Sequence, residues 1–473
     1  MGQVISNQPS LLPAPYCSSL KILQEDVPAE KFSRIKEIVE EELGRNIEEV
    51  FEKFEEEPIG AASIGQVHCA KLVTGEEVVV KVQYPEAERF FAIDFRVMLF
   101  LVDLMNPQLK DVLTAQQAIF NGEFDYTQEG RNLRTVCSEG GGKDFNFGNG
   151  RTKVAFPAPF EELTTRKVLV MTKCEGLTIT KIGRKLLEDV AGREGKSADE
   201  FVKEMKAKLK KFSAEDGKGD KVASRAVNGL SRIEFAMLRG GVMSKDYLAN
   251  GGRALYNWTA GWFGARKEYK WSFVPPDGPR LMELLWAEKA WEIFELGAFN
   301  ADPHAGNIML DVSTDVVTML DYGQLIRVTP EYREAFARYV VAIDEGDRAE
   351  VLKQWKLLGN DWTWKVTGEV NPVDETYACA LFHFGGNAGM KEGMRILKFE
   401  SLADVMDDFY KKRELRKIDI KKTCPTYGML QRTCFCLSGV GFQVGTGQQS
   451  SAKMLRPSAE RYLRRLNNKK SGK

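Results

Sequence analysis

Residues 300–323, NADPHAGNIMLDVSTDVVTMLDYG, decide the interpretation of this chain. Asp302 precedes Asn307 by five residues, and Asp321 stands directly before Tyr322-Gly323. Magnesium takes oxygen ligands, and a triphosphate site needs ligands brought together from separate backbone segments. Asn307 and Asp321 offer such oxygens, while Asp302 stands where a carboxylate orients or deprotonates a phosphoryl acceptor. The segment therefore predicts a magnesium-dependent nucleotide site.

The residues between the two metal ligands predict a β-hairpin. Two short apolar stretches, 308–310 and 316–320, flank a polar turn, which is the pattern of paired buried strands. A hairpin would place Asn307 and Asp321 at one edge. Either tripeptide alone, Asp-Pro-His or Asp-Tyr-Gly, would be read as an ordinary turn, but their joint spacing favours a nucleotide site.

The other half of such a site is expected upstream, because a kinase also needs a lysine on a strand and a carboxylate that pairs with it. Residues 77–82, EVVVKV, predict an apolar strand that carries Lys81 near its end. Residues 123–129 have a helical pattern that brings Glu129 within reach of Lys81. Taken separately, this lysine and this glutamate could be ordinary surface residues.

The loop PIGAASIGQVH, residues 58–68, takes the place of a glycine-rich phosphate loop. Small side chains let backbone N–H groups come close to phosphates, although alanine restricts the positive φ angles that glycine allows. We expect a stiffer phosphate loop than usual.

These motifs together resemble the UbiB/ADCK family of atypical kinases. The matching runs are PIGAASIGQVH, VVVKVQYPEAE, EFDYTQEGRN, TTRKVLVMTKCEG, NADPHAGN followed by LDYG, and LQRTCFCLSGVGFQVG. The resemblance covers most of the chain apart from its middle. It implies an α+β, two-lobed protein-kinase-like fold with extra helical N-terminal, middle and C-terminal segments.

The resemblance also implies ATP and Mg²⁺ as cofactors, and a set of site residues. Lys81, Glu129 and Asp302 would be catalytic, Asn307 and Asp321 would hold the metal, and the run after Met171 would be the hinge that binds adenine. The phosphates would be lined by Ala61, Ala62, Ser63 and Lys81. A regulatory family motif would comprise Gly2, Gln3, Glu123 and Asp125.

The chain also departs from the family pattern. Asn300 stands where the family has histidine, Ala305 where it has proline, and Gly60 at the first position of the alanine triplet. The N-terminus begins inside the Lys-x-Gly-Gln motif without its lysine, which indicates a truncated sequence. The same opening, Met-Gly-Gln-Val-Ile-Ser, alternatively fits the pattern for N-myristoylation of Gly2.

Composition excludes several other classes. The formal net charge is zero, so the chain lacks the basic excess expected of a nucleic-acid-binding protein. Its eight cysteines contain no Cys-x-x-Cys pair, which argues against a zinc site or a disulfide framework. The most apolar helical stretch, residues 90–105, contains charged residues and is short for a membrane span. We expect it to be a packed helix of the small lobe.

The middle of the chain, about residues 190–285, predicts an insertion. Residues 198–212 form a basic amphipathic pattern, which suits either an anionic membrane surface or, more commonly, a docked helix with a solvated charged face. An aromatic-rich stretch at 256–273 would either fill a core or contact lipid. Gly195-Lys196-Ser197 ends like a phosphate-binding P-loop, but Val190 stands where the motif needs glycine, so we reject that motif.

The expected domains follow from these assignments. Residues 1–50 form a helical extension, 51–177 a small lobe with the alanine-rich loop and hinge, 178–330 a large lobe, and 331–473 a C-terminal helical region.

The expected function is that of a magnesium-dependent ATPase or a small-molecule or lipid kinase. The family implies action at a membrane of the mitochondrion or plastid, in isoprenoid quinone (coenzyme Q or plastoquinone) biosynthesis or lipid homeostasis. Partners would be ATP, a quinone precursor or lipid, a membrane surface contacted peripherally, and quinone-biosynthesis proteins, but no nucleic acid. A protein kinase is disfavoured because no Ala-Pro-Glu run follows Asp321. The alternative is a non-catalytic scaffold that binds nucleotide and lipid.

Overall fold

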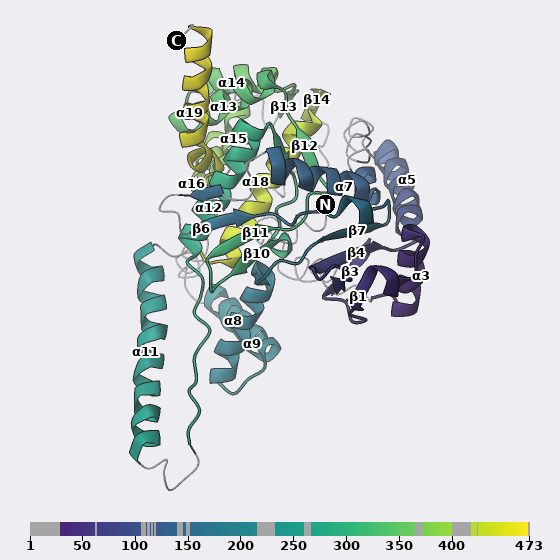
Figure 1. The fold of residues 1–473 in the computed structure, drawn as a ribbon. Coiled ribbons are helices and arrows are strands. Elements are labelled where there is room, and N and C mark those ends of the chain that lie inside the picture. Colours follow the sequence, from purple (N-terminus) through teal and green to yellow (C-terminus); the bar gives the residue numbers. More distant parts are fainter. Residues whose placement is uncertain are drawn as a thin grey trace.

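The structure is a computed structural model, and it confirms the α+β, two-lobed class. It describes residues 29–61, 64–105, 110, 114, 117, 120–139, 145–147, 152–214, 232–259, 266–364, 371–399, 418–422 and 424–471. The predictions for Gly2, Gln3, Ala62 and Ser63 lie outside these residues. Figure 1 shows a smaller, mainly β lobe beside a larger helical one.

The small lobe is built on an antiparallel sheet in the order β1-β3-β4-β7, with β2 paired to β3. In β4 the side chains of Val78, Val80 and Val82 are fully buried on one face. Side chains alternate along a strand, so Val79 and Lys81 lie on the other face. This alternation directs Lys81 towards the second lobe. The elements are α3 (Phe32–Leu43), α4 (Ile47–Val50), β1 (Phe51–Phe54), β2 (Gly60–Ala61), β3 (Gly65–Leu72), β4 (Glu77–Gln83) and β7 (Val168–Thr172).

One helix beside the small-lobe sheet contacts both lobes, because its Asn132 side chain donates to the Tyr322 carbonyl at 2.8 Å. Helix α7 (Tyr126–Arg134) begins where the Asp125 carboxylate accepts a hydrogen bond from the Thr127 N–H at 3.0 Å. It follows the 3₁₀ turn η2 (Gly122–Phe124) and continues into the π-helical turn η3 (Thr135–Glu139). This N-cap fixes the start of the helix, and with it the position of Glu129 in the first turn.

Helix α5 (Ala87–Met105) is present where the sequence predicted a helix, but it is not fully packed. Phe91 and Phe95 pack against Phe120 on its inner side, with tilted rings 6.2 and 6.3 Å apart. Its outer side leaves Phe100 68% and Leu104 74% exposed. The prediction of a packed helix was therefore wrong for this outer face, because one apolar stripe is enough to attach the helix to the lobe.

The large-lobe sheet has the order β5-β6-β11-β10-β8. The predicted hairpin is confirmed: β10 and β11 are antiparallel, with Ile308 opposite Met319. Strands β5 and β6 lie within the range expected for the small lobe, yet β6 pairs with β11 in parallel. The chain therefore enters the large-lobe sheet before it reaches β7. The strands are β5 (Phe145–Phe147), β6 (Thr152–Ala155), β8 (Leu177–Thr178), β10 (Ile308–Asp311) and β11 (Val316–Met319).

Helices surround this sheet and form the main core, which includes the fully buried Trp286, Phe336, Tyr339, Phe384 and Tyr427. Residues 331–358 and 430–466 are largely helical, in agreement with the helical C-terminal region expected from the sequence. A short pair, β9 (Ala298–Asn300) with β12 (Leu325–Arg327), brackets the hairpin. The other elements are η4 (Glu161–Leu163), α8 (Ile179–Arg193), α12 (Gly278–Trp291), the π-helical η6 (Glu292–Leu296), η7 (Ala305–Asn307), α13 (Pro330–Glu345), α14 (Arg348–Leu357), β13 (Asp361–Trp364), α15 (Pro372–Phe384), α16 (Gly386–Ile396), β14 (Ile418–Lys422), α18 (Pro425–Gln443) and α19 (Ser451–Lys470).

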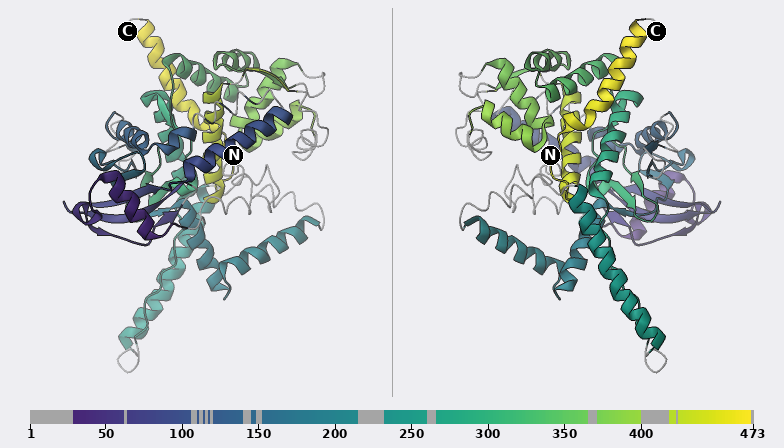
Figure 2. Two further views of the ribbon diagram at one scale, coloured as in Figure 1. Left: turned by 90° about the vertical axis from the view of Figure 1, so that its right-hand side faces the viewer. Right: turned by 90° about the vertical axis from the view of Figure 1, so that its left-hand side faces the viewer.

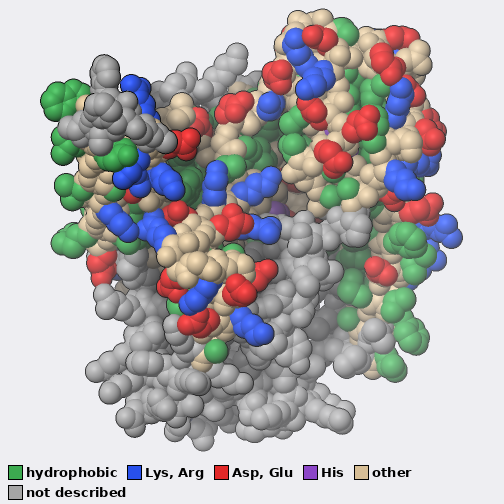
Figure 3. All heavy atoms as spheres, turned by 90° about the horizontal axis from the view of Figure 1, so that it is seen from below, with side chains coloured by type: hydrophobic (Ala, Val, Ile, Leu, Met, Phe, Trp, Pro, Cys, Tyr) green, Lys and Arg blue, Asp and Glu red, His purple; other side chains and the backbone are tan. Residues whose placement is uncertain are grey.

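The middle of the chain leaves the compact body. Helix α9 (Ala198–Ala214) packs against α8, whereas α11 (Arg232–Thr259) projects away, and residues 266–277 run back beside it (Figures 1 and 2). We call α11 and residues 266–277 the arm. In the view from below, hydrophobic side chains gather on the edge of the molecule where α11 lies (Figure 3). Within the described part of the chain, no helix has the length and apolar character needed to cross a membrane.

The glycine that joins the two lobes generates a stability prediction. Gly176 has φ +120°, and a Cβ added there would lie 2.6 Å from the Leu310 carbonyl oxygen. Gly176→Ala should therefore lower the unfolding free energy by about 3 kcal/mol, measured by urea denaturation.

A matched control is Gly183→Ala in α8, where an added Cβ would meet no heavy atom within 4 Å. Alanine in a helix interior should leave stability unchanged or raise it by about 0.5–1 kcal/mol. Equal stability of the two variants would contradict the close approach at Gly176.

Candidate functional site

Lys81 joins the two lobes through ion pairs with two carboxylates. Its Nζ lies 3.0 and 2.9 Å from the two carboxylate oxygens of Glu129, and 3.1 Å from Asp321 Oδ2. The side chain of Lys81 is 15% exposed and that of Glu129 3% exposed. Burial alone would lower the pKa of Lys81, but Asp321 and Glu129 together raise it well above its ordinary value. Lys81 is therefore held as a cation between β4, α7 and the segment after β11.

The two carboxylates around Lys81 differ electrostatically. Burial, then the nearby charge of Asp321, raises the pKa of Glu129 to about 7 although Lys81 opposes the shift. For Asp321, burial acts in the same direction, but Lys81 and the Gly323 N–H outweigh it, and the pKa falls below its ordinary value. Asp321 is thus the carboxylate that stays ionised, as a metal ligand must.

The hairpin brings Asn307 and Asp321 to one edge of the sheet, as predicted. The Leu320 N–H donates to the Asn307 carbonyl at 2.9 Å, which closes the base of the hairpin between them. The Asn307 Nδ2 faces the Asp302 carbonyl at 3.4 Å. The donor set contains only carboxylate and amide oxygens, which is the chemistry that magnesium prefers.

A wider metal cluster does not accompany this pair. Among the residues that the structure describes, no three His, Cys, Asp or Glu side chains are grouped to hold a metal ion.

Asn300, which stands where the family has histidine, connects the backbone segments that carry Asp302 and Asp321. Its Nδ2 donates to the Asp321 carbonyl at 2.6 Å, and its Oδ1 accepts the Asp302 N–H at 2.8 Å. One amide side chain therefore fixes the backbone at both predicted functional aspartates. An asparagine serves here because it carries a donor and an acceptor at once.

A buried polar cluster supports these loops from behind. Glu292 accepts hydrogen bonds from the Asn300 N–H at 2.9 Å and from the Tyr322 hydroxyl at 2.8 Å, and it pairs with Lys289. Burial, reinforced by the charge of Glu292, raises the pKa of Glu288 well above its ordinary value. The Lys289 ammonium also lies 3.7 Å from Glu288, so one buried lysine is shared by two buried carboxyl groups.

Asp302 lies against a residue that the sequence reasoning missed. Arg432 of α18 approaches it, with Nη2 2.6 Å from Asp302 Oδ2, and the Cys436 thiol lies 3.7 Å from Oδ1. Arg432 also donates to the Gln324 side-chain oxygen, and Gln324 donates to Glu123. The single charged residue in an otherwise uncharged helical run, LQRTCFCL, is the sequence signal that could have marked this position.

Within this chain of contacts, the ionised form of the Glu123 carboxylate is disfavoured. Burial raises the pKa of its carboxyl to about 7, and the charges of Asp321 and Asp302 act in the same direction, while Arg432 opposes them. The contacts connect Glu123 of the small lobe to Asp302 of the large lobe.

The remaining predicted residues lie at the rim. Ala61 is in β2. The side chain of Met171 is buried in β7, opposite Val79, and only Thr172 separates it from residues 173–176, which join the lobes. Asp125 caps α7 and does not reach the ion pairs of Lys81.

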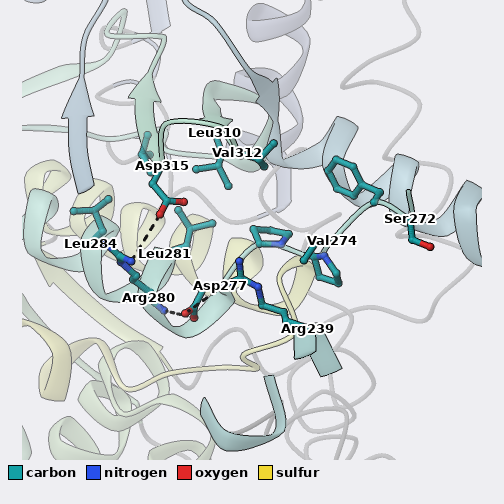
Figure 4. Close-up of a pocket in the computed structure, with 14 residues that line it drawn as sticks. Arg239, Ser272, Val274, Asp277, Arg280, Leu281, Leu284, Leu310, Val312 and Asp315 are labelled. Carbon is teal, nitrogen blue, oxygen red and sulfur yellow. Dashed lines mark hydrogen bonds and ion pairs between the residues drawn. The ribbon is translucent and has the colours of Figure 1, made fainter. Parts of the chain in front are cut away.

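A separate cavity of about 300 Å³ lies at the base of the arm (Figure 4). Its apolar lining includes Phe273, Leu281, Leu284 and Leu310. The charged residues at its rim form ion pairs with one another: Arg239 with Asp277 at 3.6 Å, and Arg280 with Asp315 at 3.8 Å. The cavity touches the turn end of the β10–β11 hairpin, whereas Asn307 and Asp321 lie at the opposite end, so it is no part of the site around Lys81.

Comparison with known proteins gives a consistent result. Residues 22–209 and 278–355 match the ABC1 atypical kinase-like domain. AarF domain-containing protein kinase 1 of Xenopus laevis is 35% identical over 181 residues, 37% of this chain and 33% of that protein. Protein ACTIVITY OF BC1 COMPLEX KINASE 8, chloroplastic, of Arabidopsis thaliana is 36% identical over 192 residues, 38% of this chain and 24% of that protein. The aligned stretch thus spans a third or less of these relatives.

Among solved structures, a Mycobacterium tuberculosis protein in complex with erythromycin aligns with 96% of this chain and 90% of its own, at 17% identity and a TM-score of 0.44. That likeness is too weak to carry the fold assignment, which rests on the family match.

The two lobes, the lysine between two carboxylates and the hairpin-borne aspartate define a kinase-like protein. The family match covers more than half of the chain. The chain belongs to the ABC1 atypical kinase-like family, the UbiB group that the motifs indicated.

The raised pKa of Glu123 generates a pH prediction. A glutamate ionises near 4.5 in the unfolded chain and near 7 here, so its charge lowers stability above pH 7, and this cost disappears as the pH falls towards 4.5. Glu123→Gln should raise the unfolding free energy by about 2 kcal/mol at pH 8 and leave it unchanged near pH 4.5.

The measurement is urea denaturation at both pH values with EDTA present, which keeps metal ions away from the site. The control is Glu162→Gln at an exposed position, which should change stability at neither pH. A Glu123→Gln variant that is destabilised at pH 8 would contradict the assignment.

Proposed function

We propose that this protein is a magnesium-dependent ATPase or a small-molecule or lipid kinase. The observation that carries the proposal is Lys81 held between Glu129 and Asp321, with Asn307 beside Asp321 at the base of the hairpin. This is the arrangement that phosphoryl transfer requires: a cation for the phosphates, a partner that positions it, and oxygen ligands for the metal.

The proposed roles follow from that arrangement. Asn307 and Asp321 would hold Mg²⁺, and Lys81 would contact the ATP phosphates while Glu129 keeps it in place. When bound, the metal ion would supply neutralisation of the charge that develops on the phosphates. Ala61, Ala62 and Ser63 would line the phosphates, and the segment after Met171 would contact adenine.

Asp302 would orient or deprotonate the acceptor. In the present structure its carboxylate is engaged by Arg432 at 2.6 Å. Action as a base therefore requires the Arg432 guanidinium to move aside or to be paired by a substrate anion. Glu123 and Asp125 would belong to the regulatory motif, and Glu123 is linked to Arg432 through Gln324.

The proposed setting is a membrane of the mitochondrion or plastid, in quinone biosynthesis or lipid homeostasis. The family supports this, and the Arabidopsis relative is named chloroplastic. A quinone precursor or lipid would be the ligand, and quinone-biosynthesis proteins the partners. We also propose the domain division expected from the sequence, with β5 and β6 assigned to the large lobe.

The second candidate function is a non-catalytic scaffold that binds nucleotide and lipid. The Asp302–Arg432 contact favours it, because the Arg432 guanidinium lies 2.6 Å from the carboxylate that a substrate acceptor would have to reach. Tight binding of nucleotide without any turnover would support this candidate.

The catalytic proposal predicts the effect of Asp321→Asn. Losing the ionised metal ligand should lower the rate of magnesium-dependent ATP hydrolysis by about a hundredfold or more, measured with the purified full chain. The isosteric control is Asp315→Asn in the turn of the same hairpin. Asp315 has φ 57°, which asparagine tolerates.

Full activity of the Asp315→Asn variant beside an inactive Asp321→Asn variant is the expected result. Equal rates in the wild type and Asp321→Asn would overturn the metal role. A wild type that binds ATP but hydrolyses none would support the second candidate function, a non-catalytic scaffold.

A further inference from the structure

The arm is built with its polar side turned inward. The Asn250 side chain donates to the Lys270 carbonyl at 2.9 Å and accepts the Lys270 N–H at 3.0 Å. Asn257 makes the same pair of bonds with Lys267, at 2.8 and 2.7 Å. Asp246 accepts from the N–H and hydroxyl of Ser272. The polar face of α11 is thus occupied by the returning chain.

The apolar side of α11 consequently faces outward. With 100° between successive residues of a helix, one stripe contains apolar side chains and the small residues Gly240, Ser244 and Gly251. The six charged residues of α11 all lie outside it. The exposed fractions of the large members are Ile233 68%, Met237 70%, Tyr247 62%, Leu248 79% and Trp258 77%.

Residues 266–277, the returning chain of the arm, also expose aromatic side chains. Tyr269 is 54% and Trp271 60% exposed, and the Trp271 ring contacts Tyr247 edge-on at 5.3 Å. Trp and Tyr with flanking Lys and Arg are typical of side chains at the boundary between water and lipid. The described arm carries seven basic and four acidic residues. Asp277 pairs with Arg239, and Arg232 pairs with Glu283 of α12, while Asp246 accepts hydrogen bonds from Ser272. The surface charge of the arm is therefore complementary to anionic headgroups.

We propose that the arm is a membrane-docking element that lies in the surface of a bilayer containing anionic lipids. The outward stripe of α11 would enter the headgroup region, and its basic residues would contact lipid phosphates. The arm falls between the two ranges that match the family domain, 22–209 and 278–355, so it is an addition to that domain.

A second copy of the chain fits the stripe less well. Helices paired as a coiled coil need large side chains at each core position to fill the facing holes, whereas Gly240 and Gly251 have no side chain and Ser244 has only a hydroxymethyl group. A fluid lipid surface needs no such knobs.

This inference deepens the membrane contact of the proposed function and rests on it, but its test is separate from ATP hydrolysis. The full chain is sedimented with vesicles of phosphatidylcholine alone and of phosphatidylcholine mixed with phosphatidylglycerol. Met237→Asp with Leu248→Asp should weaken binding to the mixed vesicles about tenfold or more. Lys245→Gln with Arg266→Gln should weaken it about fivefold per charge and reduce the preference for anionic lipid by the same factor.

The matched control is Phe100→Asp with Leu104→Asp, which places the same charges on the exposed face of α5 and should bind vesicles like the wild type. Equal binding by the wild type and the Met237/Leu248 variant overturns the inference, as does no binding by the wild type. A change from dimer to monomer in that variant without vesicles would assign the stripe to a second copy instead. If the wild type binds vesicles but hydrolyses no ATP, membrane docking by the arm is supported and the catalytic proposal is contradicted.

Discussion

The ion pairs of Lys81 are the constraint on which the rest of the site depends. A buried ammonium group left without partners costs several kcal/mol, so Glu129 and Asp321 must both reach it. That requirement couples three elements far apart in the sequence. The alternation of β4 directs Lys81 across the lobe boundary, the Asp125 cap sets α7 and Glu129, and the β10–β11 hairpin presents Asp321.

The elements behind the cleft complete this arrangement. Asn300 ties the backbone at Asp302 to the backbone at Asp321, and Glu292 holds Asn300 and Tyr322 from the π-helical turn that follows α12. Helix α18 approaches from the other side and delivers Arg432 to Asp302. The C-terminal helices are therefore part of the site, because the residue that pairs with the Asp302 carboxylate lies 130 positions later in the chain.

Sequence reasoning succeeded where the information is local. The hairpin follows from two apolar stretches around a turn, β4 from its apolar run, and α7 from its helical pattern. Arg432, Gln324 and Glu292 escaped notice because their roles arise only from contacts between distant segments. The outer face of α5 was predicted wrongly, and the arm was left open, for one reason: periodicity shows that a helix has an apolar face but not whether another element covers it.

A structure of the full chain with Mg²⁺ and a non-hydrolysable ATP analogue tests the central claim most directly. The account predicts a metal ion about 2.1 Å from an oxygen of Asn307 and from the Asp321 carboxylate, with Lys81 facing the phosphates and still paired with Glu129. A nucleotide bound elsewhere, for example in the cavity at the base of the arm, or a metal ion held without Asp321, would contradict it.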